Sequence, residues 1–204
     1  MITLAIDCAT EACSVALFDD GTLVDGRFAA IGRGHAERLV PMIAELPEKG
    51  RADRILVSLG PGSFTGVRIG LAVARALGIA WGAQVLGYPT MALVAAIARA
   101  DRAGPVSVCM NGGHGEWFVQ NFDGDGIPED AVMSLAPEAA RAAVQHLSIA
   151  GNRAAECVEG SDAGATAVAM LPEARFAPTL PAALLTNDLA PLYGRGPDAK
   201  LPGK

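Results

Sequence analysis

The sequence lacks the residue patterns of a metal centre or a redox motif. Its 204 residues include only three histidines and four cysteines. No two cysteines form a C-x-x-C pair, and no histidine lies three or four residues from another, which are the spacings typical of zinc and thiol-redox sites. We therefore expect no metal site in this chain, and reduced core cysteines at Cys8, Cys13, Cys109 and Cys157.

A membrane-spanning or secretory segment is also missing from the start of the sequence. The apolar run that begins at Met1 ends at Asp7, far short of the roughly 20 residues of a membrane span. The run has no basic residues before it, so it does not have the form of a signal peptide. We expect a first core strand here, a cytoplasmic location and no membrane association.

Positive charge is scarce. Lysine and arginine number 16 against 22 aspartates and glutamates, which gives a net charge of -6 and a pI near 5.0. Such a chain repels the phosphate backbone that supplies most of the affinity for nucleic acids. Any contact with RNA is therefore expected to be local or shared with another protein.

Apolar residues, by contrast, are plentiful enough for a folded core, at 51% of the chain against 19% charged residues. Three alternating or apolar runs at the start predict an antiparallel meander, and a continuous apolar run at residues 54–59 predicts a buried parallel strand. The expected strands of the first half are residues 2–7, 13–18, 22–29, 54–59 and 84–87, and the expected helices are a segment from Gly34 and residues 65–82 and 89–99.

The second half repeats the opening pattern in a weaker form. Strands at residues 106–110 and 117–122 flank a glycine-rich turn, and residues 101–105 resemble a linker. We therefore divide the chain into an N-terminal lobe, residues 1–100, and a smaller C-terminal lobe, residues 104–204. Further expected elements are a helix at 137–146, a strand at 147–150, a helix at 164–170 and a frayed tail at 197–204.

The most informative segment is residues 60–68, which read Gly-Pro-Gly-Ser-Phe-Thr-Gly-Val-Arg and join a strand to a helix. The first amides of a helix lack intrahelical partners, and glycine turns at such points often bind phosphate. No lysine follows the glycines as a P-loop requires. Ser63 or Thr65 can cap the free amides instead, and capping is the favoured of these two interpretations.

The helix after this turn is apolar nearly all round. Two lines run along it at every fourth position, a ridge of small residues, Gly66, Gly70, Ala74 and Gly78, and an apolar line, Ile69, Val73, Leu77 and Trp81. A helix on one face of a sheet needs only one apolar stripe. The pattern therefore predicts burial on a second side, by another helix, another lobe or another chain.

Two motifs carry a resemblance to the TsaB (YeaZ) family. Residues 5–16, with the sequence AIDCATEACSVA, resemble the family's opening, and residues 60–68 resemble its second motif at the expected separation. The match covers residues 2–98 strongly and returns at residues 191–195. Two departures are Cys8, where the family commonly has threonine, and residues 111–116, which lack an expected aspartate-arginine pair.

The resemblance implies an α/β, actin-like, sugar-kinase and heat-shock-type (ASKHA) fold of two related ribonuclease-H-like lobes, the second reduced. It also implies a non-catalytic subunit needed to form threonylcarbamoyladenosine beside the tRNA anticodon. The implied partners are the catalytic subunit TsaD, the ATPase TsaE and a second copy of the chain. ATP and metal are then expected in the partner subunits rather than here, and tRNA is contacted only indirectly.

The two predicted helices that follow His35 and Thr65 resemble those through which the family pairs with TsaD. We therefore assign the partner contact to the ridge and to neighbouring positions. The set is His35, Leu39, Met42, Gly66, Ile69, Gly70, Val73, Ala74, Leu77 and Gly78.

An enzyme of the same fold is the alternative. ATP-using relatives place an aspartate on each of two equivalent hairpins, where the carboxylates hold magnesium. Asp7 can fill the first place, but the second hairpin offers only Asn111. We interpret Asp7, with Thr10, as a turn residue left from a nucleotide site, and keep a weak ATP-binding or ATP-hydrolysing enzyme, or a metal hydrolase, as the rival hypothesis.

Overall fold

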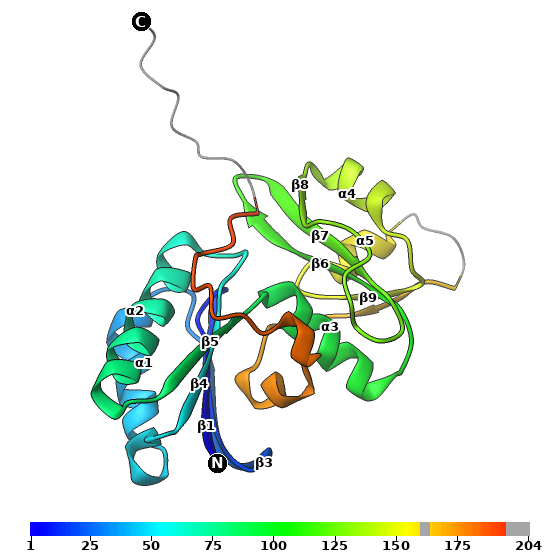
Figure 1. Ribbon diagram of the computed structural model, residues 1–204. Helices are drawn as coiled ribbons and strands as arrows, with labels where there is room; N and C mark the ends of the chain where they lie inside the picture. The colour runs from blue at the N-terminus through cyan, green and yellow to red at the C-terminus, as the bar shows by residue number, and fades with distance from the viewer. Residues whose placement is uncertain (160–163, 195–204) are drawn as a thin grey trace, which may run out of the picture.

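The computed structural model describes residues 1–159 and 164–194, and within them the chain forms two five-stranded sheets (Figure 1). The first sheet has the order β3-β2-β1-β4-β5. Its strands are β1 (Ile2–Asp7), β2 (Ala12–Asp19), β3 (Thr22–Ala30), β4 (Arg54–Ser58) and β5 (Gln84–Tyr88). As predicted, β1 to β3 form an antiparallel meander, and β4 runs parallel to β1.

The inner strands of this sheet are apolar on both faces because helices cover both faces. Leu4 and Ile6 of β1 pack in one cluster with α1 (His35–Ala44) and α2 (Phe64–Trp81), while Ala5 packs in the cluster of α3 (Thr90–Asp101). Figure 1 shows α1 and α2 on one side of the sheet and α3 on the other. This arrangement explains the uninterrupted apolar runs of β1 and β4.

The second sheet repeats the topology of the first. Its strand order is β10-β9-β6-β7-β8. When β6 is aligned with β1, both sheets have antiparallel strands on one side of the aligned strand and parallel strands on the other. Its elements are β6 (Val106–Gly113), β7 (Glu116–Phe122), β8 (Met133–Leu135), α4 (Pro137–Ala143), β9 (Ser148–Ala150), α5 (Ala154–Val158) and β10 (Thr166–Val168). Since β8, β9 and β10 have three residues each, the second lobe is a reduced copy.

One core joins the two lobes through α3. This helix is buried continuously from Thr90 to Ala98. Its cluster contains Ala16 of the first sheet together with Val106 and Phe122 of the second. A helix covered from both sides has no face left for polar residues, which accounts for its apolar sequence.

The described part of the C-terminal segment returns to contact the first lobe. The backbone N–H of Ala174 donates to Ser14 Oγ over 2.9 Å, and that of Leu192 donates to the Leu59 carbonyl over 2.7 Å. The segment includes the 3-10 helices η2 (Ala174–Thr179) and η3 (Ala182–Leu184). Long-range pairing of this kind leaves no periodic signal in the sequence.

Two local predictions in the second half also need correction, and one helix was missed. The helix expected at residues 164–170 is the strand β10, and the helix expected at 137–146 ends at Ala143. The short helix α5 was not predicted. Short elements carry too few residues for their hydrophobic period to be distinguished. The tail at 197–204 lies outside the described residues.

The small-residue ridge of α2 faces the chain's own sheet, which corrects its assignment to a partner. Gly66, Gly70, Ala74 and Gly78 are buried within the chain. A Cβ added at Gly66 would overlap the Cys8 carbonyl oxygen, and one added at Gly78 would press on Val85. Small residues are needed here because the helix backbone approaches the sheet closely.

The second apolar line of α2 meets α1 of the same chain. Ile69, Val73 and Leu77 pack against the cluster that includes Leu39 and Met42, and they remain half-buried. By length and composition alone α2 is also apolar enough to cross a membrane, with 33% of its residues buried. Core helices meet the same criterion, and the packing of α2 on a sheet and on α1 accounts for its composition.

Two alanine substitutions on the ridge are expected to act in opposite directions. Gly66→Ala places a methyl group on the Cys8 carbonyl and is expected to lower the free energy of unfolding by about 1–3 kcal/mol. At Gly70 the added Cβ finds its nearest atoms at 3.7 Å, which is ordinary contact. Gly70→Ala is therefore expected to raise stability, by up to about 1 kcal/mol from helix propensity.

Urea denaturation of the two variants and the parent chain measures both effects. A Gly66→Ala variant as stable as the parent would show that α2 does not pack on the Cys8 carbonyl as described. The Gly70→Ala variant controls for the general effect of replacing a helical glycine.

Candidate partner-binding face and interlobe cleft

The turn at residues 60–62 sets the position of α2. Ser63 Oγ accepts a hydrogen bond from the Gly66 N–H over 3.2 Å, which confirms the predicted capping. The Ser63 N–H donates to the Ala9 carbonyl over 2.6 Å, and a Cβ at Gly62 would overlap that same carbonyl oxygen. The glycine motif thus ties the start of α2 to the loop after β1.

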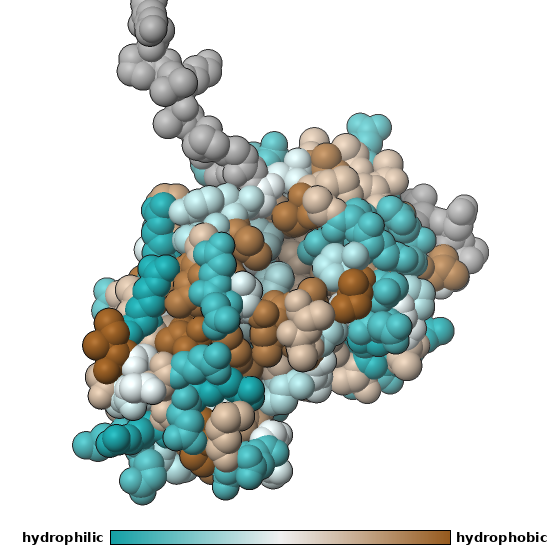
Figure 2. All heavy atoms as spheres, viewed as in Figure 1, coloured by the Kyte–Doolittle hydropathy of each residue, from teal (hydrophilic) through white to brown (hydrophobic). Residues whose placement is uncertain are grey.

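With the ridge turned inward, α1 and α2 present an outward face of mostly small and apolar residues. Val40 is 54% exposed and Ile79 is 86% exposed. Figure 2 shows hydrophobic side chains among hydrophilic ones on this side of the molecule, at the left of the view. The outward face comprises Ala36, Val40, Pro41 and Ala44 of α1 with Ala72, Ala76, Ile79 and Ala80 of α2, bordered by half-buried Ile69, Val73 and Leu77.

Three α1 residues expected at a partner contact are instead internal. Leu39 and Met42 are fully buried in the core of the first lobe. His35 is also buried, and its Nε2 lies 3.2 Å from the Ala12 carbonyl oxygen. The helical period was read correctly, but the face that it buries is covered by β2 and α2 of the same chain.

Asp7 is buried at the end of β1 and acts as a turn residue, as predicted. Its Oδ1 accepts from the Ala9 N–H over 2.9 Å, and its Oδ2 accepts from the Tyr88 hydroxyl over 3.2 Å. Burial raises the pKa of this carboxyl from 3.8 to about 6, since the surroundings disfavour the charged form. At 1% exposure the carboxylate is turned away from solvent.

Thr10, the second vestigial candidate, lies at the surface of a small cleft between the lobes. Its Oγ1 accepts from the Ala12 N–H over 3.2 Å. The cleft of about 240 Å³ is lined by Thr10, Glu11 and Ser63 from the first lobe and by Asn111 from the second. Glu11 Oε1 accepts from Asn152 Nδ2 over 2.8 Å, which connects the lobes directly. The structure therefore separates Thr10 from the buried Asp7.

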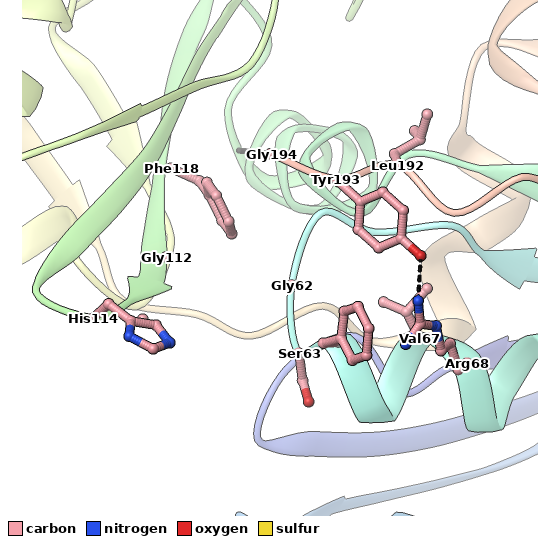
Figure 3. Close-up of a pocket in the computed structure, with 12 residues that line it drawn as sticks. Gly62, Ser63, Val67, Arg68, Gly112, His114, Phe118, Leu192, Tyr193 and Gly194 are labelled. Carbon is pink, nitrogen blue, oxygen red and sulfur yellow. Dashed lines mark hydrogen bonds between the residues drawn. The ribbon is translucent and has the colours of Figure 1, made fainter. Parts of the chain in front are cut away.

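A larger cleft of about 790 Å³ adjoins the small one. In Figure 3, His114 and Phe118 lie on one side of it, and Tyr193 and Arg68 lie on the other. Arg68 Nη2 donates to the Tyr193 hydroxyl over 2.7 Å, and the guanidinium lies 3.2 Å from the ring centre of Phe64. These contacts hold a cation among aromatic rings at the start of α2.

Sequence reasoning did not identify this aromatic cleft. Phe64 and Arg68 belong to the glycine motif, His114 and Phe118 to the second hairpin, and Tyr193 to the C-terminal segment. The return of family-like sequence at residues 191–195 was the available signal, because that segment supplies Leu192, Tyr193 and Gly194 to the cleft. The role of this segment in the cleft could be recognised only from where the segment packs in the fold.

Histidine, cysteine and acidic side chains do not gather into a group of three or more that could hold a metal ion within residues 1–159 and 164–194. His35 and His114 lie on different elements, and His146 pairs with Glu129 over 2.6 Å. All four cysteines are free and buried, as expected.

Known proteins of similar sequence and fold agree with this architecture. The family model described as TsaD, tRNA N6-adenosine threonylcarbamoyltransferase, matches residues 29–167. The chain is 37% identical over 158 residues to the tRNA threonylcarbamoyladenosine biosynthesis protein TsaB of Escherichia coli, a match that covers 72% of this chain and 68% of that protein. Its identity to the Haemophilus influenzae protein of the same name is 42% over 97 residues, or 45% and 40% of the two chains.

A solved structure extends the likeness over nearly the whole chain. YeaZ from Pseudomonas aeruginosa superposes with a TM-score of 0.79 at 27% sequence identity, covering 94% of this chain and 99% of that one. Together with the repeated sheet topology, these matches define a two-lobed α/β protein of the actin-like, sugar-kinase and heat-shock type. Within that class, the chain belongs to the TsaB (YeaZ) family.

The burial of Asp7 predicts a pH dependence of stability. The folded-state pKa of about 6 lies above the unfolded value of 3.8, so the folded protein holds this proton more tightly. Below about pH 4 the carboxyl is protonated in both states and does not change the free energy of unfolding. Between about pH 4 and pH 6 the unfolded chain loses this proton first, so the free energy of unfolding falls with rising pH, and it levels off above pH 6. The difference between the two pKa values corresponds to about 3 kcal/mol.

Asp7→Asn keeps a group of the same shape that stays neutral. The free energy of unfolding of the parent chain minus that of Asp7→Asn is expected to fall by about 3 kcal/mol between pH 4 and pH 7. Urea denaturation at four pH values measures it. If the difference is the same at every pH, the Asp7 carboxyl does not titrate in the way that its burial implies.

Proposed function

We propose that this chain is a non-catalytic subunit in the biosynthesis of threonylcarbamoyladenosine on tRNA, and that it binds the catalytic subunit TsaD through the outward face of α1 and α2. Its relatives in Escherichia coli and Haemophilus influenzae are named as biosynthesis proteins of this modification. The observation that carries the proposed mode of binding is the exposed apolar surface of two adjacent helices. Homodimers are expected to use the same face and so to compete with TsaD.

The composition of the outward face supports a protein partner. Apolar side chains as exposed as Val40 and Ile79 are normal when scattered, but a contiguous set is a mark of an interaction surface. Ala72, Ala76 and Ala80 expose only methyl groups, which allows a partner helix to approach closely. Arg68 and Arg75 border this surface and offer charge to an acidic partner.

The absence of independent catalysis is supported by Asp7. Its carboxylate lies in the interior, bonded to the Ala9 amide and the Tyr88 hydroxyl, rather than in either interlobe cleft. On the second hairpin the corresponding position holds Asn111, which is exposed and whose Oδ1 accepts from the Gly113 N–H. We therefore assign ATP and metal chemistry to TsaD and TsaE.

The net charge of -6 supports an indirect relation to tRNA, with the phosphate contacts made by the partner. Because tRNA modification of this kind acts on cytoplasmic tRNA, we place the chain in the cytoplasm.

Charge placed on the outward face is expected to break the complex. Val40→Glu and Ala76→Glu each put a carboxylate at an exposed position and are expected to weaken binding to TsaD at least tenfold, or about 1.4 kcal/mol, while leaving the fold intact. Leu147→Glu is the matched control, because Leu147 is 64% exposed and lies in the second lobe. Co-expression with TsaD, size-exclusion chromatography and calorimetry measure the effect.

The threonylcarbamoyladenosine content of tRNA, in cells where this chain replaces the resident TsaB, tests the function separately. Loss of binding with Leu147→Glu and retention with the two face variants would contradict the proposed interface. Turnover of magnesium-ATP by the purified chain alone would contradict the non-catalytic role and favour the rival enzyme hypothesis.

A further inference from the structure

Two buried thiols of the second lobe lie in direct contact. Cys109 is in the middle of β6 and Cys157 is near the end of α5, and their Sγ atoms are 2.8 Å apart. Their side chains are 0% and 3% exposed. A disulfide has an S–S length of about 2.05 Å, so the two atoms need to approach by less than about 1 Å to bond.

The surroundings of the two thiols distinguish them chemically. The hydrogen bond with Cys109 and the charge of Arg141 lower the pKa of the Cys157 thiol, against the opposing effects of burial and of the Glu156 charge. The same hydrogen bond and burial raise the pKa of the Cys109 thiol. Of the two, the Cys157 thiol is therefore the one that more readily forms the attacking thiolate.

We propose that Cys109 and Cys157 form an oxidisable dithiol that closes to an intramolecular disulfide on reaction with a hydroperoxide. The Cys157 thiolate attacks one oxygen of hydrogen peroxide, takes up an OH group as a sulfenic acid, and releases hydroxide, which is protonated to water. The Cys109 sulfur then attacks the Cys157 sulfur, loses its proton, and expels the OH group as a second water. Two thiols are oxidised by two electrons, and one peroxide is reduced to two waters.

The position of the pair connects it to the contact between the lobes. The Arg153 N–H donates to the Cys109 carbonyl over 3.1 Å, and the preceding residue, Asn152, bonds to both Glu11 of the first lobe and the Asn111 backbone of the second. Asn152 lies between β9 and α5, so a disulfide would tie α5 to β6 next to the residue that contacts the first lobe. Oxidation would therefore fix the segment through which the second lobe touches the first.

The other thiol pair provides an internal comparison. Cys8 Sγ and Cys13 Sγ lie 3.5 Å apart in the first lobe, against 2.8 Å for Cys109 and Cys157. A disulfide at the first pair therefore needs the larger movement of its sulfur atoms. On this geometric ground, oxidation is expected to select Cys109 and Cys157 over Cys8 and Cys13.

Peptide mapping of the full-length chain tests the proposal. The folded protein is treated with hydrogen peroxide, its remaining thiols are alkylated, and it is digested without reductant. We expect one linked peptide pair that contains Cys109 and Cys157, lacks two hydrogen atoms and is separated by dithiothreitol. Trp117 packs in the same cluster, so its fluorescence is expected to fall on oxidation and to recover on reduction.

Two variants test the order of the steps. Cys109→Ser removes the second thiol, so the sulfenic acid on Cys157 is expected to persist and to be trapped by dimedone, whereas the parent chain gives little adduct. The double variant Cys8→Ser, Cys13→Ser is the matched control and is expected to oxidise like the parent. The proposal fails if the parent chain keeps four free thiols, if the bond joins Cys8 to Cys13 or two chains, or if Cys157 carries a dimedone adduct in the parent.

Discussion

The close approach of the α2 backbone to the loop after β1 is the constraint on which the rest of the structure depends. Gly62 and Gly66 lie against the carbonyl oxygens of Ala9 and Cys8, with no room for a Cβ at either position. The Ser63 N–H bonds to one of those carbonyls, and its side chain caps the helix. The glycines in this segment therefore allow close backbone packing. The resemblance of the turn to a phosphate-binding loop follows from the same geometry.

This contact decides what α2 can offer to other molecules. The small-residue ridge packs against the sheet, so the residues on the opposite side of α2 form the outward face. The apolar line of Ile69, Val73 and Leu77 lies between the two, and α1 covers it only in part. The same loop carries Asp7 into the core, where its carboxyl supports a turn and Tyr88. The Asp7 carboxyl is therefore buried and does not line either interlobe cleft.

The second lobe depends on the first through α3 and through the returning C-terminal segment. The shared core around α3 spans both sheets. The Leu192 N–H donates to the carbonyl of Leu59, the residue after β4, and the Tyr193 hydroxyl accepts from Arg68 of α2. Both interlobe clefts are therefore composed of residues far apart in the chain. The contact between Cys109 and Cys157 has the same origin, since α5 folds back over β6.

The sequence by itself determined the elements with a strong period and the family. Local rules predicted the meander, a parallel strand at residues 54–59, the three long helices, a cap by Ser63 or Thr65, and a turn role for Asp7. Only the tertiary structure decided which side of α2 is covered, because a ridge of glycines suits a sheet and a second chain equally well. The path of residues 171–194, the aromatic cleft and the thiol pair were likewise decided there, since each depends on contacts between residues separated by tens of positions, which leave no period in the sequence.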